Sequence, residues 1–280
     1  MSDAPIGITE TTASSFDLVT ALVQLELTQE ANLVHTVMDY SAQVQKGADS
    51  VKIPRFDSIT AWDKTENTAA ELQSITASAD QLLLNVYKAT PVRMEDIADL
   101  QAVVNMEAEI IARLASATVR AIEATVRASL DDVSTSNPDH DIGSDGYSLA
   151  DVDILEAKRL LDIQKVPKGD RYMAVHPTQV KEVLQLANFT QQDRFAGNTS
   201  LMNGELGMAY GFKVIESTDV ESDKPLFYHK THCAFASQMA PKFEKQRAPL
   251  VNFANDYALS LLYGCKVLDS GKRGVRITVA

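Results

Sequence analysis

Residues 46–90 are the part of the sequence that most constrains what this chain can fold into. Residues 51–56 alternate apolar and polar side chains, which is typical of a half-exposed β-strand, and Pro54 favours an edge position. A second strand-like run covers residues 81–88, and residues 57–80 between the two runs are polar and contain neither Gly nor Pro. The pattern predicts a long β-hairpin with a polar tip. Because an isolated two-stranded ribbon is only marginally stable in water, this hairpin needs a partner surface.

A long helix is predicted after the hairpin. No Gly or Pro interrupts residues 92–136, and apolar side chains recur there at steps of three, four or seven residues. Residues 103–131 alone would form a helix on the order of 40 Å long, which exceeds the width of a small domain. Alanines flank the stripe and allow close packing on more than one side. The stripe consists of Ile97, Leu100, Val104, Ile111, Thr118, Ile122, Val126 and Leu130.

The rest of the chain predicts a smaller α/β unit and a set of returning strands. Residues 134–146 are rich in Asn, Asp, Pro, Gly and Ser, which indicates a loop and a domain boundary. Ser148 then fits the N-cap of a helix that ends near Gln164. At the start of the chain, residues 1–12 are small and polar, and apolar spacing predicts a helix from there as far as Met38. Further strands are expected at 171–175, 211–217, 226–229, 232–238, 242–247, 258–268 and 275–279, a helix at 178–186 after Pro177, and, as an alternative, some helix within 250–262.

The charge balance limits the classes of partner. The sequence carries 26 Lys and Arg against 38 Asp and Glu, a formal net charge of −12. This excess argues against a nucleic-acid reader, because phosphate binding depends on clustered Lys and Arg, although an acidic wall can face DNA without gripping it. No apolar run reaches about 18 residues, and residues 1–15 lack a signal-peptide pattern. We therefore expect no membrane span and synthesis in the cytoplasm.

The sequence holds none of the motifs of the common enzyme chemistries. The glycine-rich phosphate and dinucleotide loops, the serine hydrolase elbow and the zinc protease motif are all absent. His229 and His232 would point to opposite faces of a strand, which makes them poor joint metal ligands. Residues 139–141 with Asp145 resemble a cation-binding loop only in composition, and a solvated acidic loop is the favoured interpretation.

The two cysteines, Cys233 and Cys265, lack the CxxC spacing of a thiolate zinc site. We expect reduced, partly buried thiols, since free cysteine behaves as a small hydrophobe. No catalytic, cofactor-binding or metal-ligating residue is predicted, and the sequence does not indicate an enzyme.

The order of these elements resembles the shell subunits of tailed bacteriophages, which share the Hong Kong 97 fold. Residues 46–54 look like the KGDTVxIP start of the family's extended loop, and residues 262–268 look like its LYGxKVL return strand. The resemblance runs from about residue 28 to residue 280. Other similar stretches are 87–97 where the loop ends, 121–126 near the end of the spine helix, 171–177 in the axial-domain strand and turn, and 204–207 with 211–214 in the GxxGxxxGFxV segment.

The resemblance implies an α+β, Hong Kong 97-type capsid fold with an N-terminal arm, an extended β-hairpin loop, a peripheral domain with a long spine helix, and a mixed α/β axial domain. The extended loop is then expected to lie across a neighbouring subunit, and the axial domain to gather around five- and six-fold axes. The expected bounds are 1–45 for the arm, 46–90 for the extended loop, 91–145 and 239–266 for the peripheral domain, and 146–238 and 267–280 for the axial domain.

The function implied is that of a major capsid protein, which self-assembles into the icosahedral head around the double-stranded DNA of a tailed phage. It would belong to the virion and be assembled in the host bacterial cytoplasm. The expected partners are other copies in pentamers and hexamers, a separate scaffolding protein because the arm is short, a portal, an optional decoration protein, and DNA contacted non-specifically. The residues expected at the interface between subunits are Lys52, Arg55, Trp62, Lys64 and Glu66.

Two alternatives remain open at this point. An encapsulin-like nanocompartment shell shares the fold but holds an enzyme cargo in place of a genome. A soluble small-molecule enzyme that uses residues 150–240 belongs to another class, and it would form a compact small oligomer. The contents and the size of the particles distinguish the three.

Overall fold

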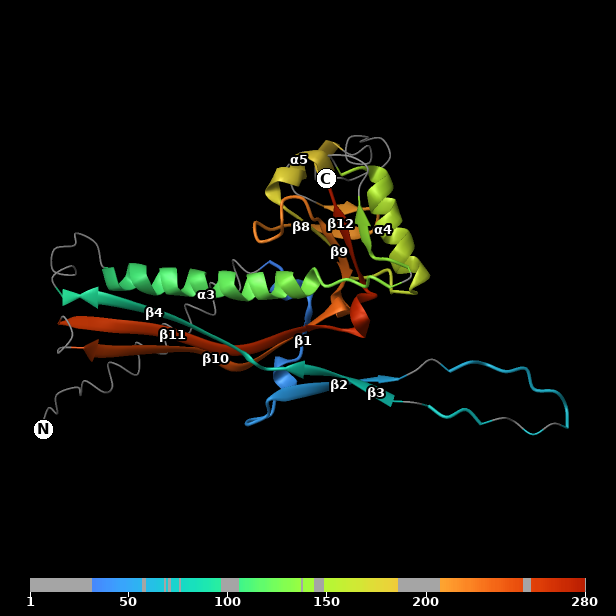
Figure 1. The fold of residues 1–280 in the computed structure, drawn as a ribbon, viewed down its shortest axis with the longest axis horizontal. Helices are drawn as coiled ribbons and strands as arrows, with labels where there is room; N and C mark the ends of the chain where they lie inside the picture. Colours follow the sequence, from blue (N-terminus) through green and yellow to red (C-terminus); the bar gives the residue numbers. More distant parts are fainter. Residues whose placement is uncertain are drawn as a thin grey trace, which may run out of the picture.

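The computed structural model of the chain describes residues 32–56, 59–67, 69, 72–75, 77–96, 106–136, 138–143, 149–185, 207–248 and 253–279. The molecule is elongated (Figure 1). A four-stranded sheet and the long helix α3 run side by side, a compact α/β unit lies over one end of them, and a two-stranded ribbon projects beyond that end.

The four-stranded sheet is built around two long antiparallel strands, β10 (Cys233–Ala248) and β11 (Ala254–Val267). β4 (Val86–Glu95) pairs antiparallel with β11, and β1 (Met38–Asp39) pairs in parallel with β10, so the strand order is β1-β10-β11-β4. Because β4 lies at the edge, it tolerates Pro91, which has no N–H to donate to a further strand.

The long helix begins later than the sequence predicts. α3 spans Met106–Leu130, and residues 92–95, which were predicted to be helical, form the end of β4. Pairing with the distant strand β11 outweighs the weak local preference for helix there. The predicted stripe is confirmed by burial at Thr118, Ile122, Val126 and Leu130; Ile111 is partly buried, and Ile97, Leu100 and Val104 lie outside the described residues.

α3 packs on the four-stranded sheet through two apolar clusters. Toward its N-terminal end, Leu114 clusters with Tyr257 of β11. Toward its C-terminal end, Val126 clusters with Phe235 of β10 and Tyr263 of β11. Each fully buried large side chain stabilises the fold by roughly 1.5–3 kcal/mol, so the helix is held along much of its length.

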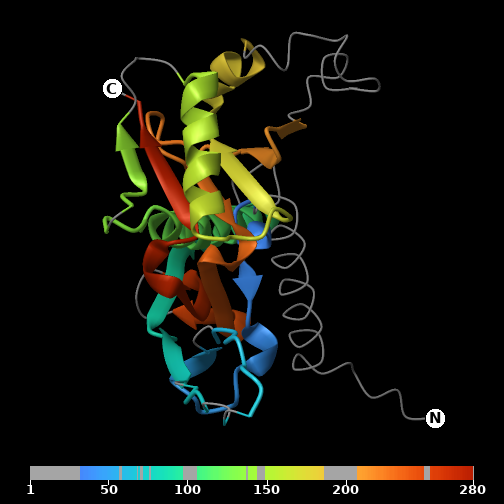
Figure 2. The same ribbon diagram turned by 90° about the vertical axis from the view of Figure 1, so that its right-hand side faces the viewer.

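The compact unit contains a six-stranded mixed sheet in the order β5-β12-β9-β6-β8-β7. Figure 2 shows α4 (Asp151–Ile163) lying across one face of this sheet, where Leu161 clusters with Phe227 and Ile277. The other elements are β5 (Asp141–Gly143), β6 (Arg171–Val175), α5 (Pro177–Gln185), β7 (Met208–Ala209), β8 (Phe212–Glu216), β9 (Leu226–His229) and β12 (Gly274–Thr278).

Most predicted elements of this unit are confirmed, including the helix that starts at Pro177. The start of α4 differs, because Ala150 precedes it and the Asp153 carboxylate accepts a hydrogen bond from the Ala150 N–H at 3.0 Å. Ser148, the predicted N-cap, lies outside the described residues. The short strands β5 and β7 were not predicted, since two or three residues carry no periodic pattern.

Three other predictions are wrong in the described residues. The helix expected to reach Met38 is replaced by a 3-10 turn at Val34–Thr36 and by β1, while residues 1–31 lie outside the described part. The strands expected at 232–238 and 242–247 are one strand, β10, with shifts of register between Ser237 and Lys242. Residues 254–262 belong to β11, so the alternative of a helix does not hold there.

The ribbon consists of β2 (Ser50–Phe56) paired antiparallel with β3 (Ala77–Leu83). The single strand predicted at 81–88 is divided, because the chain leaves the ribbon after Leu83 and enters β4 at Val86. Gly264 of β11 lies against this crossing. A Cβ atom on Gly264 would stand 2.0 Å from the carbonyl oxygen of Leu83, so only glycine permits the approach.

We expect Gly264→Ala to push the ribbon away from β11, because the added methyl group would overlap the Leu83 carbonyl. The overlap should lower the free energy of unfolding by about 1–3 kcal/mol, measurable by thermal or denaturant unfolding. Gly143→Ala is the matched control, since a Cβ there meets nothing within 4 Å. Equal losses of stability in the two variants would contradict the close approach.

We expect Ile122→Asp to prevent folding, because it places a charge on the buried stripe of α3, where Ile122 is 1% exposed. The cost should be on the order of 4 kcal/mol or more. Ala124→Asp puts the same charge on the exposed side of the helix and should fold. Circular dichroism of both soluble fractions gives the comparison, and a well-folded Ile122→Asp subunit would show that the helix face is misassigned.

Candidate functional site

The base of the ribbon is fixed to the rest of the chain. Val51, Leu82 and Leu84 are buried there and cluster with Ala234, Ala236 and Leu268. Polar contacts add to this, since the Lys266 ammonium donates to the Gln81 carbonyl at 3.0 Å and the Gln238 amide donates to the Ala48 carbonyl at 2.7 Å. The base therefore has a hydrophobic core of its own and a fixed direction.

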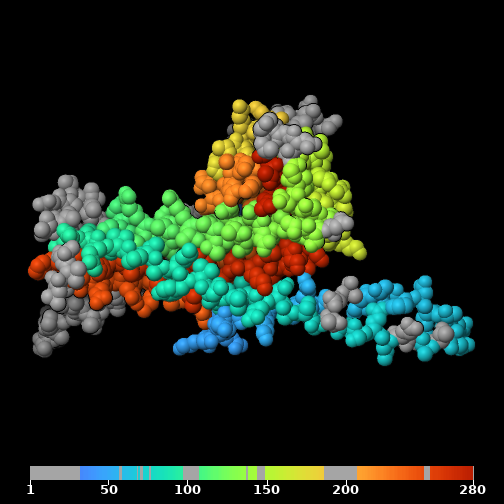
Figure 3. All heavy atoms as spheres, in the orientation of Figure 1, coloured from blue at the N-terminus to red at the C-terminus, as the bar shows by residue number. Residues whose placement is uncertain are grey.

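The ribbon tip, residues 59–75, is different. Every described residue of the tip is exposed, and in Figure 3 the tip stands clear of the rest of the chain on the face in view. Large apolar side chains are among them: Leu72 is 98% exposed and Trp62 is 65% exposed. Exposed aromatic side chains are enriched in contact sites between proteins. The other exposed large apolar side chains on or beside the tip are Phe56, Ile59 and Ile75.

The two arms of the tip are tied together by one side chain. The Gln73 amide accepts a hydrogen bond from the Thr60 N–H at 3.1 Å and donates one to the Thr60 carbonyl at 2.8 Å. This pair of bonds imitates a rung of a β-ladder beyond the last paired residues of β2 and β3. The tip thus presents its apolar side chains on a partly ordered frame.

The residues predicted for the subunit interface fall into two groups. Trp62, Lys64 and Glu66 all lie exposed on the ribbon tip. Lys52 is exposed on β2, opposite Gln81. Arg55 is partly buried, and its guanidinium forms an ion pair with Asp269 of the same chain at 2.6 Å, so the described structure uses it to hold the ribbon base.

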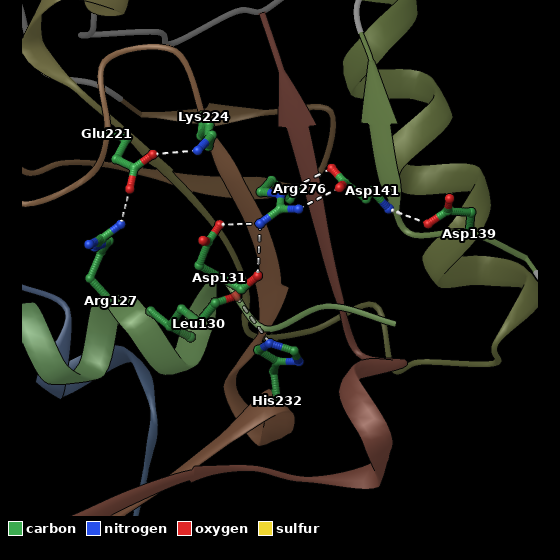
Figure 4. A network of polar contacts seen from close by, with 9 residues as sticks. All are labelled: Arg127, Leu130, Asp131, Asp139, Asp141, Glu221, Lys224, His232 and Arg276. Atoms are coloured by element: carbon green, nitrogen blue, oxygen red, sulfur yellow. Dashed lines mark hydrogen bonds and ion pairs between the residues drawn. The ribbon is translucent and has the colours of Figure 1, made fainter. Parts of the chain in front are cut away.

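A second polar site joins the end of α3 to the six-stranded sheet (Figure 4). Arg276 of β12 lies between two carboxylates: its guanidinium is 3.1 Å from Asp131 Oδ1, just beyond α3, and its Nε is 3.0 Å from Asp141 Oδ1 of β5. The hydrogen bonds from Arg276 hold the pKa of Asp141 below its usual range. One guanidinium thus connects the long helix to two strands of the compact unit.

A parallel contact lies one helical turn earlier. Arg127 of α3 forms an ion pair with Glu221, which also accepts a hydrogen bond from the Lys224 ammonium at 2.6 Å. The bonds from Lys224 and Arg127 lower the pKa of Glu221. The carboxylates of Asp141 and Glu221 therefore stay ionised near neutral pH. Their contacts with Arg276 and Arg127 fix the compact unit relative to α3.

The prediction of a solvated acidic loop at residues 139–141 is confirmed for Asp139, which is exposed, and is wrong for the two residues that follow it. Asp141 is paired with Arg276, and the Asp139 carboxylate accepts a hydrogen bond from the Asp141 N–H at 2.9 Å. His140 between them is fully buried, with Nδ1 2.6 Å from the Gly274 carbonyl oxygen. Asp145 lies outside the described residues. The composition could not reveal that Arg276, far along the chain, neutralises this segment.

Glu123 is a buried carboxylate that sequence analysis assigned no role. It is 2% exposed on α3 and accepts hydrogen bonds from the Leu33 N–H at 2.9 Å and the Val34 N–H at 3.0 Å. Burial raises the pKa of Glu123, while the two backbone bonds oppose that rise. The carboxylate ties the N-terminal segment at residues 32–36 to the spine helix. A charged residue on the apolar side of a helix was the only available signal.

The two histidines near the end of β9 are held by contacts within the chain. His229 Nδ1 lies 2.8 Å from the Thr231 hydroxyl, and His232 is fully buried with Nε2 3.3 Å from the Leu130 carbonyl oxygen. Across the described residues, no group of three or more His, Cys, Asp or Glu side chains is placed to hold a metal ion. In the same part of the chain, none of the helices is long and apolar enough to cross a membrane.

Comparison with known proteins identifies the fold. The chain is similar to a solved structure of Mycobacterium phage Che8, with 20% identity, 89% of this chain and 91% of that chain covered, and a TM-score of 0.73. It is also similar to the capsid structure of Cyanophage P-SCSP1u, with 14% identity, coverage of 88% and 86%, and a TM-score of 0.71. The asymmetric unit of the bacteriophage PhiM1 mature capsid gives 14% identity, coverage of 89% and 87%, and a TM-score of 0.66. No curated protein matches the sequence.

These likenesses confirm the predicted α+β, Hong Kong 97-type capsid fold. The phage capsid protein family matches residues 85–270, and the chain belongs to that family. It is a major capsid protein, a structural component of the phage virion and not an enzyme. Self-association of identical copies follows from that role.

We expect the folded subunit to lose stability as the pH falls from about 6.5 to about 4. Burial lowers the pKa of His232 from 6.5 to about 4, so the unfolded chain takes up a proton that the native chain refuses in this window. The loss should approach roughly 3 kcal/mol and level off near pH 4.

Denaturant unfolding at several pH values measures this effect. His232→Gln cannot titrate, so its free energy of unfolding should depend less steeply on pH between 6.5 and 4, whatever its absolute value. An unchanged slope in His232→Gln would mean that other groups cause the acid sensitivity.

Proposed function

We propose that this subunit assembles with copies of itself into the icosahedral head of a tailed phage, around double-stranded DNA, and that the ribbon tip packs on a neighbouring copy. The observation that carries the proposal is the contrast along the ribbon. Its base is buried in its own chain, while Leu72 and Trp62 at its tip remain exposed. Burying such side chains is favourable by roughly 1.5–3 kcal/mol each, so a partner surface would stabilise them. In a capsid, that partner is a second copy of the chain.

The arrangement of the subunit follows from the same proposal. The arm is residues 1–45, the extended loop 46–90, the peripheral domain 91–145 with 239–266, and the axial domain 146–238 with 267–280. The four-stranded sheet with α3 supports most of the peripheral assignment, and the six-stranded sheet supports most of the axial one. Two of the bounds differ from the sheets, since residues 86–90 belong to β4 of the first sheet and residues 141–143 form β5 of the second. The border at 238/239 falls inside β10, where its register shifts. The axial domains gather in pentamers and hexamers.

The interface on the ribbon is proposed to include Trp62, Lys64 and Glu66 at the tip and Lys52 on β2. The aromatic side chain supplies apolar area, and the flanking charges fix the register of the contact with the neighbour. Arg55 contributes indirectly, since its ion pair with Asp269 orients the ribbon.

The other proposed partners rest on the class of protein. They are a separate scaffolding protein, a portal, an optional decoration protein, and packaged DNA contacted without sequence specificity. The net charge of −12 supports weak, non-specific contact with DNA, because a surface rich in carboxylates does not grip phosphates.

Removal of the ribbon tip tests the proposal. Phe56 pairs with Ala77 at the end of the β-ladder, so residues 57–76 can be replaced by Asn-Gly, the pair favoured in two-residue hairpin turns. We expect a soluble subunit with unchanged circular dichroism that no longer forms particles, as judged by sedimentation and electron microscopy.

Two point variants sharpen the comparison. Trp62→Ser removes the exposed aromatic side chain and should weaken assembly, whereas Ser74→Ala, a small change at an exposed polar residue of the same tip, should assemble normally. Normal DNA-filled particles from the variant without a tip would refute the proposed contact. Particles from the native source that are filled with protein and lack DNA would refute the role as a genome container.

A further inference from the structure

The two cysteines of the chain, 32 residues apart in the sequence, meet on one face of the four-stranded sheet. In the β10/β11 register, Cys233 is opposite Val267 and Phe235 is opposite Cys265. The cysteines are thus diagonal neighbours whose side chains point to the same face, the one that packs on α3. Their sulfur atoms are 2.9 Å apart and neither is bonded to another cysteine.

This separation places the thiols close to bonding geometry. A disulfide has a sulfur–sulfur distance of about 2.05 Å, so the pair must close by about 0.9 Å. Diagonal cross-strand neighbours are about 7–8 Å apart and a disulfide spans about 4.4–6.8 Å between Cα atoms, so the bond requires side-chain rotation together with a small approach of the two strands. Two thiols held this close at the start of β10 and the end of β11 are a preformed precursor of a cross-strand bond.

The two thiols differ in accessibility and acidity. Cys233 is fully buried, whereas Cys265 is partly exposed, so a small oxidant in solution reaches Cys265 first. The hydrogen bond from the Cys233 thiol lowers the pKa of Cys265, and the same contact raises the pKa of Cys233. Because the thiolate is the reactive form, Cys265 is suited to react first and Cys233 to complete the bond.

We propose that Cys233 and Cys265 form an intrachain disulfide once the phage head leaves the reducing host cytoplasm. Disulfides are rare in the cytosol and persist on virions, where the surroundings are oxidising. With a glutathione disulfide as the oxidant, the Cys265 thiolate attacks one of its sulfurs and releases one glutathione thiolate. The Cys233 thiol then loses its proton, attacks Cys265 Sγ and displaces the second glutathione. Two protein thiols are oxidised, and one disulfide is reduced to two thiols.

The location gives this bond a mechanical effect. β10 begins at Cys233, directly after the turn that leaves the six-stranded sheet, and β11 ends two residues after Cys265. A bond there would close the long β10/β11 hairpin at the end where it meets the compact unit. It would restrict the unfolded chain and thereby stabilise released particles after assembly is complete.

Oxidation of purified full-length subunit and of assembled particles tests the proposal. After incubation with oxidised glutathione, we expect both thiols to become unreactive to a thiol reagent added under denaturing conditions. Intact mass should fall by two hydrogen atoms per chain, and non-reducing digestion should yield the Cys233 peptide joined to the Cys265 peptide. The unfolding temperature should rise on the order of 5–10 °C over the reduced sample.

The single variants separate the two steps. Cys233→Ser should stop at the mixed disulfide and retain one glutathione, whereas Cys265→Ser should remain unmodified, because its only thiol is buried. The double serine variant should show no rise in unfolding temperature on oxidation. Wild-type thiols that stay titratable, wild-type protein that retains glutathione, or a disulfide between different chains would each overturn the proposal. The wild-type measurements decide the question even if a serine variant fails to fold.

Discussion

The ribbon of β2 and β3 is buried against its own chain at the base and exposed at the tip. The rest of the structure depends on the contacts that hold the base. The chain passes from β3 to β4 directly over Gly264, so closely that no side chain fits between the backbones. Val51, Leu82 and Leu84 then bury the ribbon base against β10 and the turn after β11, and Arg55 is paired with Asp269 there. A ribbon fixed in this way points away from the body of the subunit. Its exposed apolar tip can reach a neighbour because the contacts at the base keep the ribbon from folding back onto its own chain.

The body of the subunit is held together by contacts between α3 and the two sheets. α3 packs on the long strands, and Arg276 and Arg127 connect the end of α3 to the compact unit through partly exposed ion pairs. At the same end, Glu123 holds the N-terminal segment on the helix. In a closed shell of identical copies the same contacts are repeated around each symmetry axis, so the ion pairs that connect the two sheets bear on every subunit of the shell.

The sequence predicted those features that depend on local periodicity. The alternation at residues 51–56 gave β2, and the stripe from Thr118 to Leu130 gave the buried face of α3. It could not predict features made by residues distant in the sequence. Residues 92–95 are strand because β11 pairs with them, Asp141 is neutralised by Arg276, and Cys233 meets Cys265 only through the β10/β11 register. For the candidate interface, the sequence pattern was enough to predict the ribbon and to single out Trp62. It could not predict that Arg55 holds the ribbon base, because its partner Asp269 is distant in the sequence.

Electron cryo-microscopy of assembled particles tests the central claim most directly. The account predicts that the ribbon tip of each subunit lies on an adjacent copy, with Trp62 and Leu72 buried in the contact between them. A map in which the tip touches only its own chain, or extends into solvent without contact, would contradict it.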